Sequence, residues 1–336
     1  MQKSRSIIVI ALLLLSLIGF FSCKSDKPVK ASSTGKADEV IVVIEDNLWK
    51  TTIGDSIKSF FNSNRTGLPQ PEPLFKIIQL KFDEFSRFFE THRNILAVAI
   101  DSSLTEGKYE TAYNVWAMPQ RVVKITAPNI ENLKELFETH KRDIFNIYEN
   151  EEIKRLQAFY SRTQNPAAVK LIKEKFHLKV KVPRDYYVAV NKPGFLWLRN
   201  EADIISQGII IYSYPYTDTV AFNLNKIISV RNQFTHLYIP GPSDSSYMVV
   251  AGSIIPPVKR NLDIKKALVV ETRGLWEVRR DFMGGPFINY TFVDKKNNMV
   301  ITLDGYVYAP NKDKADLLRQ VQSVLLTFEF EEAQPD

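Results

Sequence analysis

The feature that most limits what this chain of 336 residues can fold into is a short apolar segment close to its start. Residues 7–21 are almost all apolar, and Lys3 and Arg5 precede them. A helix needs about 20 apolar residues to cross the hydrocarbon core of a membrane, so this segment is too short to span it. A basic start followed by a short apolar region is typical of a signal peptide. We therefore predict that residues 1–22 are a cleaved signal and that the folded part follows them.

Cys23 comes directly after this segment and is the only cysteine of the chain. Bulky Phe20 and Phe21 do not fit the small-residue site of an ordinary secretory signal. The order Gly19-Phe20-Phe21-Ser22-Cys23 instead resembles the end of a bacterial lipoprotein signal, in which the cysteine sulfur forms a thioether to diacylglycerol. Because each buried CH₂ contributes about 0.8 kcal/mol, two or three acyl chains give a practically permanent anchor. We predict lipid attachment at Cys23, with palmitate among its chains, and hence a membrane partner reached through this lipid.

Residues 23–38 are rich in Lys, Ser, Ala and Asp and lack apolar periodicity, which predicts a flexible tether with folding from Glu39 onward. Of the first four residues after the cysteine only Asp26 is acidic, which argues against export to the cell surface. We expect a lipid-anchored protein of the cell envelope that faces the periplasm, with the outer membrane favoured over the inner one. Loss of Lys3 and Arg5 lowers the net charge from +6 to +4. Acidic residues lie among the basic ones throughout, so no nucleic-acid partner is predicted.

The first half of the folded part, residues 39–175, shows alternating strand and helix patterns, and we predict it as an N-terminal strand-helix domain. A β-branched run over Glu39–Glu45 predicts a strand, and apolar residues at helical spacing follow it through Phe61. Two further strands are predicted at Asn94–Asp101 and Thr111–Ala117. A helical connector over residues 145–175 ends this half, with a break at Asn165-Pro166.

Residues 74–92 and 122–140 resemble each other as two copies of one strand-helix unit, offset by 48 residues. The apolar positions of both copies share one helical face. A chance likeness between two amphipathic helices is the alternative. If the copies are equivalent, His92 and His140 both lie near helix C-termini, where the helix dipole favours a histidine. A more specific hypothesis is that His92 and His140 form a metal-binding or catalytic pair.

From residue 176 the pattern changes to short strands and turns, and we predict a C-terminal antiparallel α+β domain over residues 176–331. Residues 177–182 alternate between polar and apolar side chains, which predicts a half-buried strand. The further predicted elements are strands at Tyr186–Asn191, Gly194–Arg199, Gly208–Tyr214, Tyr247–Ser253, Ala267–Thr272, Leu275–Phe282, Phe287–Val293, Met299–Tyr308 and Thr327–Phe330, and helices at Thr219–Phe234 and Asp313–Leu326. The predicted fold class is therefore α+β, with two mixed α/β layers and a mostly antiparallel C-terminal sheet flanked by helices.

Two resemblances support this class. The run from Lys179-Val180-Lys181-Val182-Pro183 through Tyr306-Val307-Tyr308-Ala309-Pro310 and the closing helix resembles the order of elements in the PsbP and Mog1-like α+β fold. The lipoprotein signal, the stretch Gly274-Leu275-Trp276-Glu277-Val278 and the stretch Asp281-Phe282-Met283-Gly284-Gly285-Pro286-Phe287 resemble a family of Bacteroidota lipoproteins known as domain of unknown function 4837. That likeness would cover nearly the whole chain. It implies a lipoprotein of unassigned activity and supplies no catalytic residues.

The stretch after Leu275 also supplies the candidate binding residues, which are Trp276, Glu277, Arg279 and Asp281. As a strand it places Trp276 on one face together with Phe282, and the three charged residues on the other. The charged face could clamp an anionic group, with Arg279 as the donor. A row of exposed cross-strand ion pairs is the alternative. Gly284-Gly285-Pro286 is predicted as a turn between strands.

The sequence carries no recognisable catalytic signature: it has no HExxH, no Walker A loop and no GxGxxG. Residues 241–245 miss the nucleophile-elbow pattern at its last position. We therefore predict no catalytic residue, no metal and no cofactor, and leave enzymatic activity open.

Three functions remain. The first is a non-enzymatic binding or assembly module for an envelope protein partner, which an exposed aromatic patch at Phe195, Trp197 or Tyr216 would support. The second is a small-molecule or lipid carrier, which needs a deep apolar cavity. The third is an envelope hydrolase with a carboxylate-based site, which needs two carboxylates in one cleft. The first is favoured because catalytic motifs are absent, and the sequence leaves the oligomeric state open.

Overall fold

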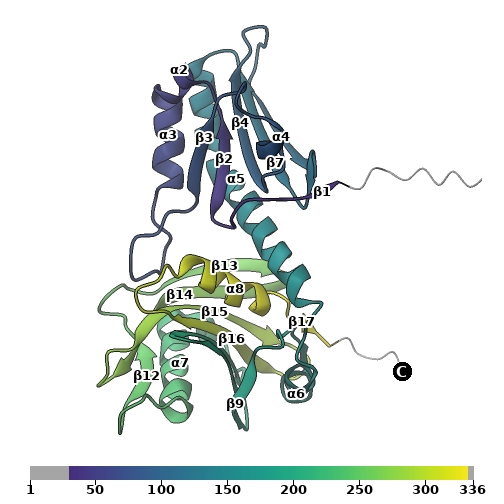
Figure 1. The fold of residues 1–336 in the computed structure, drawn as a ribbon. Coiled ribbons are helices and arrows are strands. Elements are labelled where there is room, and N and C mark those ends of the chain that lie inside the picture. Colours follow the sequence, from purple (N-terminus) through teal and green to yellow (C-terminus); the bar gives the residue numbers. More distant parts are fainter. Residues whose placement is uncertain (1–29, 332–336) are drawn as a thin grey trace, which may run out of the picture.

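The computed structural model describes residues 30–331, which form two large β-sheets with helices packed against both, and two short pairs of strands (Figure 1). The first sheet is mixed and the second is antiparallel, so the predicted α+β class is confirmed. The predicted signal peptide and Cys23 lie outside the described residues. Within the described part, no helix is both long and apolar enough to cross a membrane.

The N-terminal sheet has the strand order β3-β2-β4-β7-β5. Its strands are β2 (Glu39–Val43), β3 (Lys76–Leu80), β4 (Asn94–Ile100), β5 (Lys108–Tyr113) and β7 (Arg121–Ala127). The first four in this order pair in parallel, and β5 runs antiparallel to β7. Parallel strands are buried on both faces, which agrees with the continuous β-branched run that predicted β2.

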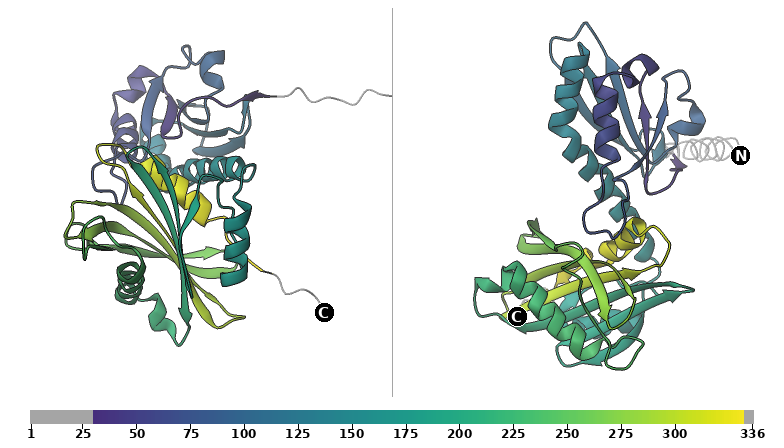
Figure 2. Two further views of the ribbon diagram at one scale, coloured as in Figure 1. Left: turned by 60° about the horizontal axis from the view of Figure 1, so that its bottom comes forward. Right: turned by 90° about the vertical axis from the view of Figure 1, so that its left-hand side faces the viewer.

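Helices cover one face of this sheet, and shorter segments cover the other. The first face carries α2 (Asp46–Trp49), α3 (Thr52–Phe61) and α5 (Ile130–Tyr160), and the other carries the short helix α4 (Arg87–Glu90). Figure 2 shows α3 and α5 side by side on the same face. Phe60, Phe61 and Phe75 lie between them and the sheet in edge-to-face contacts. On the opposite face, Phe85, which precedes α4, and Phe89 of α4 pack against the sheet.

The folded chain begins earlier than the tether prediction allows. Strand β1 (Ala31–Ser32) pairs in parallel with β6 (Ala117–Met118). The backbone N–H of Thr34 donates to the carbonyl of Thr91 at 2.8 Å. The prediction that folding starts at Glu39 is therefore wrong, because backbone pairing that needs no apolar side chain already holds residues 31–34.

The two copies of the predicted repeat supply strands of the same sheet, but their helices differ in length and cover opposite faces of it. Each supplies a strand of the same sheet, β3 and β7, followed by a helix. The first helix, α4, has four residues, whereas the second, α5, has 31. His140 consequently lies inside α5, so the expectation that both histidines lie near helix C-termini is wrong for His140.

Helix α5 links the two halves of the protein. Its 31 residues span about 46 Å at the usual rise per residue, and Figure 1 shows it running from the first sheet to the second. Gln157 near its end donates to the carbonyl of Ser323 at 3.1 Å. The predicted break at Asn165-Pro166 is confirmed: the Asn165 side chain caps α6 (Pro166–Phe176) by accepting from Ala168 N at 3.1 Å.

The C-terminal sheet has the order β12-β14-β15-β16-β11-β10-β9, and β13 also pairs with β14. Its strands are β9 (Tyr187–Lys192), β10 (Phe195–Ala202), β11 (Ile205–Pro215), β12 (Tyr247–Val250), β13 (Val258–Ile264), β14 (Ala267–Arg279), β15 (Gly284–Asp294) and β16 (Met299–Tyr308). A separate pair joins β8 (Leu178–Lys179) to β17 (Glu329–Phe330). In the segment around β8, Leu178, Val180 and Val182 are buried, which confirms the predicted alternation.

Helices cover both faces of this sheet. Helix α8 (Ala315–Leu325) and α6 bury one face in a cluster of aliphatic and aromatic side chains. Helix α7 (Leu224–Tyr238), preceded by the short helix η2 (Thr219–Phe222), covers the other. Beneath α7, Arg231 and Asp304 form an ion pair with fully buried side chains.

Three local predictions in this half are wrong. Residues 267–279 form one long strand, β14, where two strands were predicted. The chain turns at residues 280–283, and Gly284 and Gly285 then open β15, so the predicted glycine turn lies inside a strand. The strand β13 was missed because most of its side chains are exposed, which removes the apolar alternation that marks a strand.

Candidate functional site

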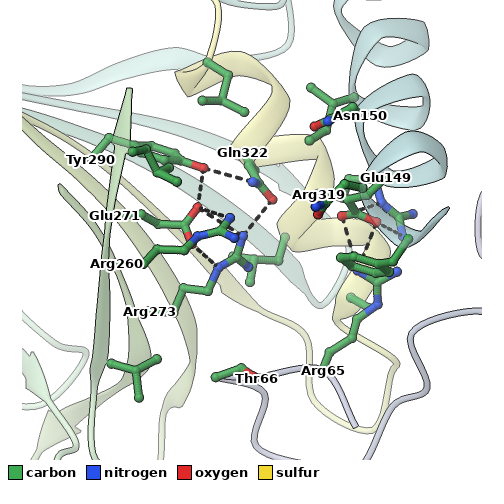
Figure 3. Close-up of a pocket in the computed structure, with 18 of the residues that line it drawn as sticks. Arg65, Thr66, Glu149, Asn150, Arg260, Glu271, Arg273, Tyr290, Arg319 and Gln322 are labelled. Atoms are coloured by element: carbon green, nitrogen blue, oxygen red, sulfur yellow. Dashed lines mark hydrogen bonds and ion pairs between the residues drawn. The ribbon is translucent and has the colours of Figure 1, made fainter. Parts of the chain in front are cut away.

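A cavity of about 560 Å³ lies between the two halves of the protein, where α5 and α8 meet strands of the C-terminal sheet. Polar side chains from both halves project into it (Figure 3). Basic residues outnumber acidic ones along its lining: these are Arg65, Arg142, Lys259, Arg260, Arg273 and Arg319 against Glu149, Asp263 and Glu271. We call it the arginine cavity. Its surplus charge is positive and therefore favours anions.

Glu271 is the centre of the first group of polar residues, and the sheet register explains the group. Arg260 on β13 and Tyr290 on β15 are the direct cross-strand partners of Glu271 on β14. Arg273 follows two positions later on the same strand and therefore faces the same side. Three adjacent strands thus place four long polar side chains on one face. Gln322 reaches this face from α8.

The carboxylate of Glu271 accepts hydrogen bonds from three of these neighbours. Arg260 donates through Nε at 2.8 Å and Nη2 at 3.2 Å, and Arg273 donates through Nε at 2.9 Å. Tyr290 donates its hydroxyl proton at 2.9 Å and accepts from Gln322 Nε2 at 2.9 Å. Arg273 also donates to the Gln322 carbonyl oxygen at 3.2 Å. These bonds hold both guanidinium groups in fixed orientations at the cavity wall.

Glu149 is the centre of the second group and comes from α5 in the other half. Arg319 of α8 donates to it through Nε at 3.2 Å and Nη2 at 3.1 Å. Arg65, in the segment after α3, donates through Nη1 at 3.1 Å and 3.2 Å. The Arg65 guanidinium also lies over the ring of Phe75, 5.4 Å from its centroid. One carboxylate thus joins two arginines that are far apart in the sequence.

Both carboxylates are ionised across the physiological range. Burial by itself would raise the pKa of Glu149, but Arg319 and Arg65 outweigh it and lower this pKa to about 2. Burial likewise opposes the effect of Arg273 and Arg260 on Glu271, whose pKa is also lowered to about 2. Neither carboxyl group can therefore supply a proton near neutral pH.

The first group keeps hydrogen-bond donors that no protein acceptor uses. Among residues 30–331, Nη1 of Arg260 and Nη1 of Arg273 find no acceptor. The Arg260 side chain is 58% exposed and that of Arg273 is 21% exposed, while Glu271 beneath them is 2% exposed. The arrangement offers a pair of positioned guanidinium groups to a ligand with carboxylate or phosphate oxygens.

The candidate binding residues predicted from the sequence lie at the opposite end of β14. Trp276 is buried, and its Nε1 donates to the carbonyl of Val307 at 3.2 Å. Glu277 is partly exposed and Arg279 is exposed. The strand ends at Arg279, so Asp281 lies in the following turn and accepts from the Ser243 hydroxyl at 2.8 Å. In the described part of the chain, no ion pair joins Arg279 to Glu277 or Asp281.

One expectation about aromatic residues is wrong, and Phe195 and Trp197 do not supply the aromatic patch that would have supported a protein-binding site. Phe282 does not share the buried face of Trp276: it is fully exposed, because the turn carries it past the end of the strand. Phe195 and Trp197 do not form an exposed patch, since α7 covers their face of the sheet and both are buried. Trp276 and Trp197 instead line a small cavity of about 240 Å³.

The two histidines of the predicted repeat lie in different surroundings. His92 is buried, and its Nε2 lies 3.6 Å from a carboxylate oxygen of Glu39. His140 stacks on the ring of Tyr109 with the centroids 4.1 Å apart. Over residues 30–331 no group of three or more His, Cys, Asp or Glu side chains is placed to hold a metal ion.

Sequence reasoning missed the arginine cavity because its parts are distant along the chain. One signal was present: Glu271 and Arg273 stand two residues apart inside an apolar strand, where charged side chains are costly unless paired. Their partners could not be named, because Glu149 and Arg319 meet only through the packing of α5 on α8.

Comparison with known proteins gives family matches without an assigned activity. Residues 165–327 match the family model described as domain of unknown function 4837, which confirms that resemblance for this part of the chain. The resemblance does not extend over nearly the whole chain as expected, since residues 33–161 match a different model, domain of unknown function 8532. No curated protein matches the sequence.

Two solved structures show a distant likeness to the chain. One is the Ran-binding protein Mog1p of Saccharomyces cerevisiae, with a TM-score of 0.31 and 8% identity over 46% of this chain and 91% of that one. The other is a point mutant of Mog1, with a TM-score of 0.30 and 8% identity over 46% of this chain and 92% of that one.

Proposed function

We propose that the protein is a lipid-anchored binding module of the bacterial cell envelope that takes a small anionic ligand in the arginine cavity. The ligand class is a molecule with carboxylate or phosphate groups. The observation that carries the proposal is the pair of Nη1 groups on Arg260 and Arg273, which are held in place by Glu271 and have no acceptor within residues 30–331.

The geometry favours binding over hydrolysis at this cavity. A carboxylate-based hydrolase needs one carboxyl group with a raised pKa as its general acid. Glu149 and Glu271 both have a pKa of about 2, and each accepts from two arginines. Their role in the proposal is to orient guanidinium groups, which in turn hold the ligand.

The cavity lies at the boundary between the two halves of the protein. Arg65 and Glu149 come from the first half, while Arg260, Arg273 and Arg319 come from the second. Protein acceptors already use the donors of Arg65 and Arg319, so the ligand would lie against Arg260 and Arg273, next to this contact between the halves. Ligands frequently bind at such boundaries between structural units.

Calorimetric titration of the purified full chain with inorganic phosphate and with citrate tests this proposal. The informative variant is Arg260→Gln, which removes a half-exposed guanidinium and leaves Glu271 paired with Arg273. Arg279→Gln is the matched control, because Arg279 is an exposed arginine on the neighbouring strand β14, outside the cavity. We expect saturable binding that weakens about tenfold in Arg260→Gln, the effect of one charge-assisted hydrogen bond. Equal weakening in both variants, or no binding of either anion, would exclude the proposal.

The anchor is tested separately by replacing Cys23 with Ser and fractionating the cells. We expect the variant to leave the membrane fraction and to lose incorporation of labelled palmitate, because the thioether requires the cysteine sulfur. A variant that stays in the membrane and still incorporates the label would show that the lipoprotein assignment is wrong. This outcome would leave the ligand proposal untouched, since the lining of the cavity begins at Arg65 in the sequence and does not include Cys23.

A further inference from the structure

A second cavity, of about 670 Å³, lies at the edge of the C-terminal domain and shares no residue with the arginine cavity. It is bounded by the turn between β13 and β14, the turn between β15 and β16, the segment before α7 and the last strand, β17. Its volume falls in the range of about 300–1,000 Å³ that is usual for small-molecule sites. We call it the lysine-rimmed pocket.

Apolar side chains from four separate segments form its interior. They are Tyr216, Phe222, Leu268, Val293 and Phe330. Leu268 is 52% exposed although it lies on a strand, and Phe222 and Phe330 are only partly buried. Tyr216 and Phe222 have their ring centroids 6.4 Å apart. The domain thus leaves apolar surface open inside a concave site, where burying it against a ligand is favourable.

Four lysines stand around this apolar interior, in two pairs. Lys265 and Lys266 form the tip of the β13–β14 turn, where both have positive φ, 53° and 62°. Lys295 and Lys296 begin the β15–β16 turn on the other side. Because two separate turns each place two lysines at the same opening, the positive charge is concentrated at the entrance.

The acidic residues of the pocket are occupied by other groups. Asp294 accepts from the backbone N–H of Lys296 at 3.0 Å and from Asn297 Nδ2 at 2.6 Å. Glu331 pairs with Lys173 at 3.0 Å. Lys265 contacts the carbonyl of Phe328 and lies 3.9 Å from Glu329. In the region from residue 30 to 331, Lys266, Lys295 and Lys296 have no ion-pair partner.

We propose that the lysine-rimmed pocket binds a fatty acid, with the acyl chain along the apolar interior and the carboxylate at the rim between Lys266 and Lys295. The apolar interior of the pocket favours an acyl chain, and the unpaired ammonium groups at its rim favour an anionic head group. Each methylene that enters the pocket tightens binding about fourfold. The ligand is a single-chain lipid that this site would hold independently of the anchor on Cys23.

Photo-crosslinking in membranes tests the proposal on the full chain. Cells that express the protein receive a palmitate analogue with a diazirine in its chain, are irradiated, and the crosslinked peptides are identified by mass spectrometry. We expect crosslinks on the peptides that contain Leu268, Val293 or Phe330. An excess of palmitate should compete, and an equal excess of hexadecyltrimethylammonium, which has the same chain and a cationic head, should not. Peptide mapping separates this signal from the acyl chains on Cys23.

Two variants make the test specific. The double substitution Lys266→Glu with Lys295→Glu should lower the crosslink yield about tenfold, because two attractions become repulsions. Lys226→Glu, at an exposed lysine of α7 outside the pocket, is the matched control and should leave the yield unchanged. Equal competition by the cationic amphiphile, unchanged labelling in the double variant, or crosslinks spread over the whole surface would each overturn the proposal.

Discussion

Glu149 on α5 and Arg319 on α8 face each other in a two-pronged ion pair, with Nε 3.2 Å and Nη2 3.1 Å from the two carboxylate oxygens. The pair joins the halves of the protein, since α5 begins against the first sheet and α8 packs on the second. Arg65 adds a third partner from the first half. The Arg319 side chain is 1% exposed, so water cannot replace the carboxylate.

The first prediction concerns the substitution Glu149→Ala. We expect a loss of about 3–5 kcal/mol in the free energy of unfolding, because the guanidinium of Arg65 would remain buried without a counter-charge and that of Arg319 would keep only Asp316. We also expect the two halves to unfold in separate steps. Urea unfolding followed by tryptophan fluorescence and circular dichroism measures both effects. The control is Glu174→Ala, which removes an exposed partner of Lys170 and should change the free energy by less than about 0.5 kcal/mol. The prediction would be contradicted if fluorescence and circular dichroism of Glu149→Ala showed one common unfolding transition. It would also be contradicted if the free energy of unfolding fell by less than the contribution of one ordinary hydrogen bond.

The second prediction concerns pH. The pKa of Glu149 and that of Glu271 are each lowered from 4.5 to about 2 in the folded protein. The stability they contribute is therefore fully present above pH 4.5 and is lost as the pH falls from 4.5 toward 2, by at most about 3 kcal/mol for each carboxyl group. Urea unfolding at pH 6 and pH 3 measures the loss.

The variant Glu149→Gln is the control for this pH dependence. It carries no titratable group at position 149, so its free energy of unfolding should fall less steeply between pH 6 and pH 3 than that of the unchanged protein. Parallel pH profiles would show that the Glu149 carboxyl group is not the source of the slope.

The sequence predicted those elements whose burial follows a simple period. The alternation around β8 and the apolar face of α8 appear in the structure because one side of each element packs against the core. The strand β13 escaped prediction because most of its side chains are exposed, and β14 was predicted as two strands although it runs without a break. Arg260 and Glu271 are neighbours only because of the register in which β13 pairs with β14. The site could therefore not be predicted from the sequence without knowledge of this register.

The third prediction concerns the buried ion pair below α7. Arg231 donates to Asp304 through Nε at 2.8 Å and Nη2 at 3.1 Å, and its guanidinium lies over the ring of Phe287. Arg231→Leu should cost about 3–5 kcal/mol, because it leaves Asp304 buried with Asn289 as its remaining side-chain donor among the described residues. Chemical unfolding of the single variants and of the double variant Arg231→Leu with Asp304→Leu measures this cost.

The double variant separates charge from packing. Replacing both partners with apolar residues should recover most of the lost stability, since no unpaired charge remains. If the double variant is as unstable as the sum of the single variants, packing around Arg231 and not its charge explains the cost.

The fourth prediction concerns Gly285, which lies inside β15 where a turn was expected. A Cβ at this position would stand 2.0 Å from the carbonyl oxygen of Val307, a backbone atom that the sheet holds in place. Gly285→Ala should therefore lower the free energy of unfolding by about 1–3 kcal/mol through overpacking. Gly252→Ala is the matched control, because a Cβ there meets its nearest neighbour, Pro257, at 3.7 Å. Thermal unfolding of the two variants compares them directly, and equal melting temperatures would show that the sheet can move to make room at Gly285.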